Sequence, residues 1–240
     1  MRPATDLVSA LARTFKQLVL SPTKRRLRTL RRSTVLASAV GKAKQQLRVQ
    51  QVPDRDLLDR ISFGWDNEAW SASPEFQQAM LREARAPRTT VLECGTGITT
   101  LLLAMLIDTR GIHSWALEHD RTWYDTIQQR LAKFSLPSSH IALAPLKNYG
   151  EFDWYDVAQT TLPEAFGLVV CDGPPGGTRG GRYGLMPTML QRLVPGARIL
   201  FDDTQRAEEH SIMQHWLKNY SPQLRLVAEH DSYSILELVA

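Results

Sequence analysis

The chain has 240 residues, of which 43% are hydrophobic, and a formal net charge of +4. This length suits one α/β domain with an extension, and the lack of any apolar run near 20 residues excludes a membrane-spanning helix. Residues 1–50 hold twelve Arg and Lys against one acid, a net charge of +11, so the remainder carries −7. Because the basic character belongs to the N-terminal segment, we expect no nucleic-acid substrate for the domain, although that segment could touch phosphates.

The N-terminal segment is predicted to be a basic extension, 1–52, that precedes a domain at 53–240. One face of a predicted helix carries Leu7, Leu11, Phe15 and Leu18. Such a helix could dock on an anionic membrane, where each basic residue contributes about 1 kcal/mol. It could instead be an organelle transit peptide, pack on the domain, or stay mobile. We expect no secretory signal, because Arg13 and Lys16 interrupt the candidate apolar region. The expected location is cytoplasmic, at a membrane surface if the helix docks there.

An aromatic stretch, 63–72, comes before the first predicted strand and contains Trp65 and Trp70. These rings could cover a ligand, or they could anchor a leading helix to the sheet. Ser73 is predicted to cap a helix whose first residue is Pro74.

The stretch 91–100 predicts a strand, a tight turn and the start of a helix. Gly95 and Gly97 enclose Thr96 in this turn, and glycines there let a ligand approach the main chain at a helix N-terminus. A dinucleotide turn would carry a third glycine, where this chain has Thr100. Glu93 also places an acid where a pyrophosphate would lie, so a cationic ligand fits better.

The next predicted strand, 112–117, ends at Glu118. Gly97 and Glu118 are 21 positions apart, close to the spacing of about 20 that places an acid on a ribose hydroxyl. S-adenosylmethionine (SAM) combines a ribose with a positively charged sulfonium and amino group. These residues therefore predict SAM as the cofactor.

Further strands are predicted at 141–144, 166–171 and 198–201, a helix at 207–219, and a closing antiparallel pair at 224–229 and 233–239. The strand at 166–171 leads into Asp172-Gly-Pro-Pro-Gly, and the strand at 198–201 leads into Asp202 and Asp203. Cys94 and Cys171 each end a strand, so we expect unbridged neighbours in a reducing compartment.

Four blocks in this order resemble one bacterial group of class I SAM-dependent methyltransferases: Leu92–Gly97, Leu117–Asp120, Asp172–Gly176, and Asp202 with Asp203. The resemblance covers the chain from about Phe63 to the C-terminus. It implies an α/β fold of the Rossmann-like kind, with a seven-stranded, mostly parallel sheet, helices on both faces and a C-terminal antiparallel hairpin.

The resemblance also implies cofactor contacts. Glu93, Gly95, Thr96, Gly97, Glu118 and Asp172 would bind SAM. His119, just past the second strand, is a candidate adenine contact. Many members of the class carry an acid after the third strand that binds adenine, but Pro145 and Leu146 stand there, so the backbone of Leu146 is the expected substitute.

The acceptor side is predicted around Asp172 and Asp203, either of which could remove a proton from a hydroxyl. Arg179, Arg182 and Tyr183 lie in a glycine-rich segment that we interpret as a mobile lid gripping an anionic substrate, or as a plain flexible loop. Asp172 could also be an electrostatic wall or cap the next loop.

Asp172, Asp202 and Asp203 together resemble the Mg²⁺ ligands of catechol-type O-methyltransferases, and oxygen ligands suit that ion. Asp203 stands where those enzymes have Asn. Two aspartates at a strand end are also common helix caps.

The predicted function is therefore SAM-dependent methyl transfer to a hydroxyl of a small molecule or saccharide. Two alternatives remain open. One is a nicotinamide-dependent oxidoreductase, which Thr100 and Glu93 disfavour. The other is a non-catalytic module that keeps the fold and uses its basic tail as an anchor.

Overall fold

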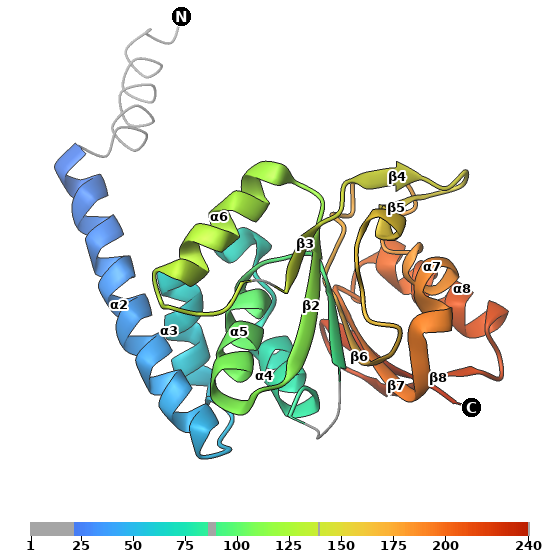
Figure 1. The fold of residues 1–240 in the computed structure, drawn as a ribbon, viewed down its shortest axis with the longest axis horizontal. Coiled ribbons are helices and arrows are strands. Elements are labelled where there is room, and N and C mark those ends of the chain that lie inside the picture. Colours follow the sequence, from blue (N-terminus) through green and yellow to red (C-terminus); the bar gives the residue numbers. More distant parts are fainter. Residues whose placement is uncertain (1–21, 86–89, 139, 240) are drawn as a thin grey trace, which may run out of the picture.

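A seven-stranded sheet forms the centre of the protein in a computed structural model that describes residues 22–85, 90–138 and 140–239 (Figure 1). Its strand order is β3-β2-β1-β6-β7-β9-β8. The strands are β1 (Thr90–Cys94), β2 (His113–Glu118), β3 (Ile141–Leu143), β6 (Phe166–Cys171), β7 (Leu193–Asp202), β8 (Leu224–Glu229) and β9 (Tyr233–Leu238). Within this sheet β9 is antiparallel to both of its neighbours, β7 and β8, and all other pairings are parallel. The predicted sheet and closing hairpin are confirmed.

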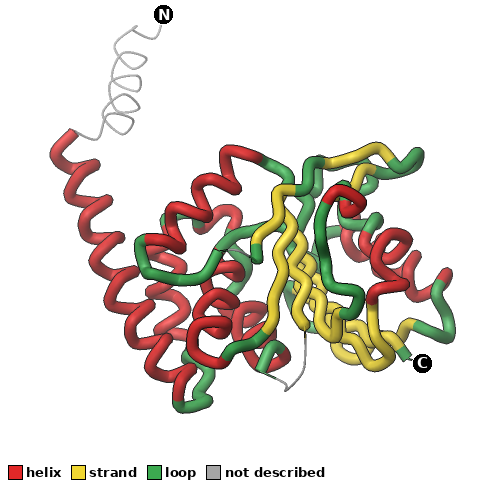
Figure 2. The backbone as a smooth tube through the Cα atoms, in the orientation of Figure 1, coloured by secondary structure: helices red, strands yellow, loops and turns green. Residues whose placement is uncertain are grey.

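Helices cover both faces of this sheet (Figure 2). On one face lie α2 (Pro22–Arg48), α3 (Arg55–Trp65), α4 (Pro74–Glu83), α5 (Ile98–Arg110) and α6 (Arg121–Ala132), and on the other α7 (Leu185–Met189) and α8 (Ala207–Asn219). Short 3-10 turns occur at Glu68–Trp70, Val157–Gln159 and Leu190–Arg192. As predicted, the Ser73 hydroxyl caps α4 by accepting from the Phe76 amide at 3.1 Å.

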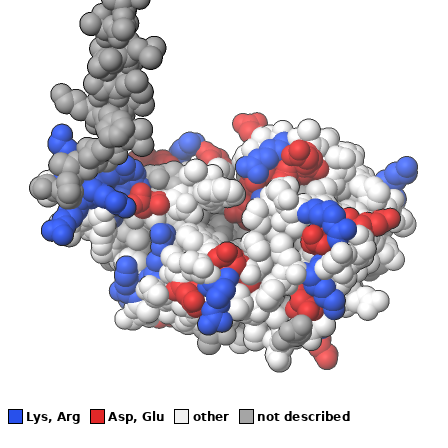
Figure 3. Space-filling model, turned by 90° about the horizontal axis from the view of Figure 1, so that it is seen from above, with Lys and Arg blue, Asp and Glu red and all other residues white. Residues whose placement is uncertain are grey.

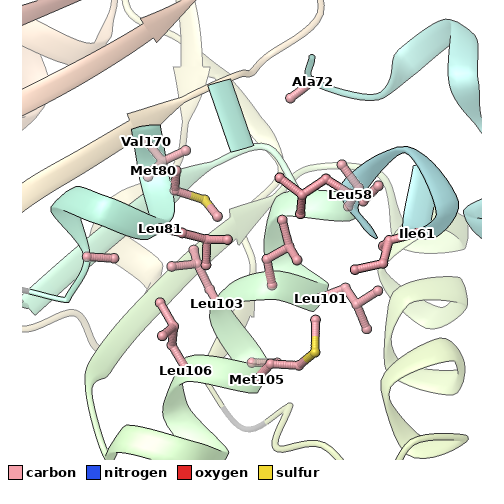
Figure 4. Close-up of a cluster of buried hydrophobic side chains, with 14 of the residues drawn as sticks. Leu58, Ile61, Ala72, Met80, Leu81, Leu101, Leu103, Met105, Leu106 and Val170 are labelled. Atoms are coloured by element: carbon pink, nitrogen blue, oxygen red, sulfur yellow. The ribbon is translucent and has the colours of Figure 1, made fainter. Parts of the chain in front are cut away.

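The strands divide their side chains between two hydrophobic clusters because successive residues of a strand point to opposite faces. Val91 packs with α2–α6, whereas Leu92 and Cys94 pack with α7 and α8. Figure 4 shows part of the first cluster, where Leu101 and Leu103 of α5 meet Leu58 of α3 and Met80 of α4. Cys94 and Cys171, predicted to be neighbours, are paired in register across β1 and β6 as buried free thiols.

The long helix α2 lies along α3 and α5. Its C-terminal half adds Leu36, Ala39, Val40, Ala43 and Leu47 to the first cluster. A Cβ at Gly64 of α3 would lie 2.6 Å from the Leu36 Cβ, so the two helices approach closely at that glycine. The predicted helix at residues 7–19 lies outside the described residues. Within the described ranges, none of the helices has both the length and the apolar content needed to span a membrane.

A short hairpin, β4 (Leu146–Asn148) with β5 (Asp153–Tyr155), follows β3 in the chain and forms a separate two-stranded sheet. This hairpin is not among the elements predicted from the sequence. Its aromatic residues Trp154 and Tyr155 are fully buried and extend the second cluster beyond the sheet edge.

Candidate active site

A cavity of about 560 Å³ opens at the carboxyl ends of β1, β2, β6 and β7. Figure 3 looks onto this side of the molecule and shows the surface hollowed near its middle. The lining residues come from six segments: Asn67, Ala69, Trp70, Ser71 and Ala72; Gly95 and Thr96; Glu118, His119, Asp120 and Trp123; Tyr155; Asp172, Gly173, Pro175, Gly176 and Arg182; and Asp202, Asp203 and Arg206. Ligands of open α/β sheets bind at this edge.

The turn after β1 requires a glycine at only one of its two glycine positions. Gly95 has φ +85°, and a Cβ there would lie 3.0 Å from the Gly173 Cα, so the chain cannot carry a side chain at this point without strain. Gly97 has an extended backbone, with φ −177°, which other residues also adopt. Nothing lies within 4 Å of a Cβ placed on Gly97. Of the two glycines in this turn, Gly95 alone therefore has backbone angles that other residues rarely adopt.

Glu118 ends β2 with a carboxylate that the turn holds in place. Its Oε2 accepts from the Thr96 amide at 3.2 Å and the Thr96 hydroxyl at 2.5 Å, and its Oε1 accepts from the Asp120 amide at 2.8 Å. Burial acts to raise the pKa of Glu118, but the effects of His119, Thr96 and the Asp120 amide outweigh it, and the pKa is lowered. Glu118 is therefore an ionised acceptor on the cavity wall.

Glu93 does not line the cavity, although the sequence places an acid beside the ligand. Alternation along β1 turns it toward α5, and its side chain is fully buried there. Burial raises the pKa of Glu93 to about 8, a rise that Thr99 and Thr100 moderate. Neither carboxylate oxygen has a hydrogen-bond partner among the described residues. Glu93 is therefore neutral at pH 7 in the ligand-free protein, and it supplies no charge to attract a cation.

Three aspartates gather around Arg182 at the other end of the cavity. Arg182 is only 2% exposed. Its Nη2 donates to Asp172 Oδ1 at 3.1 Å and to Asp203 Oδ2 at 2.8 Å, and its Nη1 donates to the Asp202 carbonyl at 2.7 Å. Arg206 pairs with Asp203 Oδ1 at 2.9 Å. Asp203 has φ +63°, a left-handed conformation that is uncommon outside glycine.

The pKa values of Asp172 and Asp202 move in the direction opposite to that of Glu118. Burial raises the pKa of Asp172 to about 6, against the lowering effect of Arg182. Burial also raises the pKa of Asp202 well above its ordinary value, and Asp172 and Asp203 add to this rise. Burial would lower the pKa of Arg182, but the surrounding acids raise it. At neutral pH, Asp172 is therefore a carboxylate with a pKa close to the surrounding pH.

The residues of the predicted Mg²⁺ site do not fit a metal ion as they stand. Carboxylate oxygens of Asp172, Asp202 and Asp203 lie within 4.8 Å of one another, as a shared cation requires. The guanidinium of Arg182 already contacts two of these carboxylates, so the positive charge is supplied by the chain itself.

Other predicted site residues lie outside the cavity lining. Arg179 donates to Asp153 Oδ1 at 2.5 Å and to the Gly150 carbonyl at 2.7 Å, which ties its loop to the β4–β5 hairpin. Tyr183 packs edge-on against Phe152, with ring centroids 5.3 Å apart. Leu146 is half-buried in β4. The structure thus joins Arg182 to the aspartates but directs Arg179 and Tyr183 toward the hairpin.

Trp123 and Tyr155 are among the cavity residues that the sequence did not assign to the site. Trp123 of α6 donates its indole N–H to the Thr96 carbonyl at 2.8 Å and so braces the turn. Tyr155 of β5 is fully buried, and its hydroxyl has no hydrogen-bond partner in the described part of the chain. Trp123 was identifiable only as an apolar position of α6, and Tyr155 depends on the unpredicted hairpin.

No protein-family model matches the chain, and no curated protein matches it in sequence. Solved structures do resemble it. The O-methyltransferase from Bacillus cereus in complex with SAH is 14% identical, with a TM-score of 0.54 over 84% of this chain and 100% of that one. An SAH-bound methyltransferase from Podospora anserina is 14% identical, with a TM-score of 0.54 over 84% and 88%.

A methyltransferase from Pyrococcus furiosus is 16% identical, with a TM-score of 0.51 over 82% of this chain and 98% of that chain. At such low sequence identity these similarities are evidence for the fold alone. The protein therefore has the Rossmann-like methyltransferase fold, with a cavity at the sheet edge where such folds bind ligands.

Proposed function

We propose that this protein transfers a methyl group from SAM to a hydroxyl of a small molecule or saccharide. The observation that carries the proposal is Glu118, an ionised carboxylate at the end of β2 that the turn after β1 holds against the cavity. Two structural relatives are described with SAH, the form of the cofactor that has lost its methyl group, and one of them is an O-methyltransferase.

In this proposal, the ribose hydroxyls of SAM donate to Glu118. A carboxylate has about four acceptor positions, of which the Thr96 amide, the Thr96 hydroxyl and the Asp120 amide occupy three, so a second ribose contact would replace that of the Thr96 hydroxyl. His119 and Asp120 follow Glu118 along the cavity, and we assign the adenine to that end. The methionine part would extend past Gly95 toward Asp172, because β1 and β6 are neighbours in the sheet. Contacts from Gly97 and the Leu146 backbone stay predictions.

Asp172 is the proposed general base. Its pKa of about 6 leaves it ionised at pH 7, yet close enough to the surrounding pH to take up a proton. Asp203 shares Arg182 with it and is the second candidate. When SAM is bound it supplies the electrophilic methyl group. Asn67, Trp70 and Ser71, which line the cavity, would exclude water and position the acceptor.

A nicotinamide dinucleotide fits this cavity less well. Glu118, Asp172 and Asp203 line it, and a pyrophosphate would bring further negative charge beside them. A non-catalytic module would keep cofactor binding but would not need a base with a pKa near neutrality.

Calorimetric titration with SAM, SAH and NADH tests the proposal. SAM and SAH should bind, NADH should not, and Glu118→Ala should abolish most of the affinity for SAM. Glu164→Gln, an exposed acid far from the cavity lining, is the matched control. Preferential binding of NADH would overturn the proposal. SAM binding without turnover against a panel of hydroxylated compounds would favour the non-catalytic module.

A further inference from the structure

Arg182 is a charged side chain at the cavity that contacts all three aspartate residues of the cluster. It comes from the loop after β6, yet it is almost fully buried and reaches the ends of two strands at once. Its Nη2 alone contacts Asp172 Oδ1, Asp203 Oδ2 and the Asp172 carbonyl at 2.8 to 3.1 Å. A planar guanidinium suits this task, because its fixed N–H directions can serve several oxygens at once.

We propose that Arg182 takes the place of a divalent cation, holding Asp172 and Asp203 in position for methyl transfer that needs no metal. The aspartate cluster is then a latent metal site that the guanidinium occupies. The catalytic part of this inference rests on the proposed function. The metal part does not, because it can be tested on the protein without cofactor or acceptor.

The spacing of the acids supports this assignment. Oxygens of Asp172, Asp202 and Asp203 lie within 4.8 Å of one another, which leaves room for one shared cation among them. A divalent ion needs several oxygen ligands at about 2.0 to 2.6 Å. Asp172 Oδ1 and Asp203 Oδ2 already accept from Arg182. An ion and the guanidinium would therefore compete for the same oxygens.

The local charge leads to the same conclusion. Arg182 and Arg206 place two positive charges against the three acids. Adding a divalent ion would crowd like charges, because Arg182 Nη2 and the ion would share the same two carboxylates at a buried site. Removal of Arg182 leaves three adjoining acids whose remaining ion-pair partner, among the described residues, is the half-exposed Arg206.

Mn²⁺ titration followed by electron paramagnetic resonance tests the inference on four proteins: the wild type, Arg182→Met, Arg182→Lys and Arg179→Met. Arg179 is the matched control, because it is an arginine of the same loop whose carboxylate partner, Asp153, is outside the aspartate cluster. We expect no stoichiometric binding to the wild type, Arg182→Lys or Arg179→Met at Mn²⁺ on the order of 1 mM. We expect one ion to bind to Arg182→Met, with a Kd at least roughly 10-fold below that concentration.

Mg²⁺ should also raise the melting temperature of Arg182→Met and leave that of the wild type unchanged. If Arg182→Met folds only when Mg²⁺ is present, the inference is supported. Stoichiometric Mn²⁺ binding to the wild type that Asp203→Asn removes would overturn it, and so would a folded Arg182→Met that binds no metal. Failure of SAM to bind the wild type would count against the proposed function and leave the metal result as it stands.

Discussion

The two ends of the cavity use the same chemical group in opposite ways. At the β2 end, backbone and hydroxyl donors surround Glu118, and its pKa is lowered. At the β6–β7 end, Asp172 is surrounded by other acids and one buried arginine, and its pKa is raised to about 6. A lowered pKa suits a permanent hydrogen-bond acceptor, and a pKa near neutrality suits proton transfer. We therefore propose that the first end binds the cofactor and that the second end carries out the chemistry.

The largest expected effect is at the chemical end. Asp172→Asn should lower kcat by about 10² to 10⁴-fold, the usual contribution of a general base, and should change the Kd for SAM little. The wild-type rate should rise with pH and be half-maximal near pH 6, because Asp172 accepts a proton only after losing its own. The rate of SAH release during turnover of an accepted substrate measures kcat and its dependence on pH. Asp56→Asn, on the surface of α3, is the control, and an unchanged kcat in Asp172→Asn would remove Asp172 from the chemistry.

At the binding end, Glu118→Ala should weaken SAM by about 3 kcal/mol, roughly 100-fold, because two hydrogen bonds to a charged acceptor are lost. The kcat at saturating SAM should stay within a few-fold of the wild type. Calorimetry gives the affinity, and steady-state kinetics gives kcat. A variant that loses kcat but keeps its affinity would reverse the roles assigned to the two ends.

Glu93 is a buried acid outside the cavity lining, so its ionisation is tested through the stability of the fold. Because its folded-state pKa is raised to about 8 from an ordinary 4.5, it stabilises the fold fully only below about pH 4.5. That contribution declines until pH 8, by up to about 1.4 kcal/mol per pH unit. Glu93→Gln should therefore gain free energy of unfolding relative to the wild type between pH 5 and pH 8, as urea unfolding would measure. A difference that does not vary with pH would mean that Glu93 is ionised in the fold.

The smallest effect distinguishes the two glycines of the turn. Gly95→Ala should cost about 1 to 3 kcal/mol of unfolding free energy, because alanine is strained at φ +85° and its Cβ would lie 3.0 Å from the Gly173 Cα. Gly97→Ala should cost less than about 1 kcal/mol, because its backbone is extended and the space around it is open. Thermal unfolding compares the two. Equal losses would contradict the backbone assignment.

Local signals in the sequence were enough to predict the main strands, the turn at Gly95 and the position of Glu118 at the end of β2. Each of these depends on residues close together in the chain, such as an apolar run that ends in an acid. The Arg182 contacts could not be predicted, because they depend on how a loop folds back across two strand ends. The side of β1 to which Glu93 points is set by strand alternation, but its protonation depends on the α5 residues packed over it. To place Tyr155 at the cavity, one would have had to predict a hairpin with only three residues per strand.

The most direct test of the central claim is a crystal structure of the protein with SAM bound. We expect that the ribose hydroxyls lie within hydrogen-bonding distance of Glu118, that the methyl group faces Asp172, and that Arg182 still contacts Asp172 and Asp203 without an intervening metal. A cofactor bound elsewhere, or with its methyl group turned away from Asp172, would contradict the division of the cavity into a binding end and a chemical end.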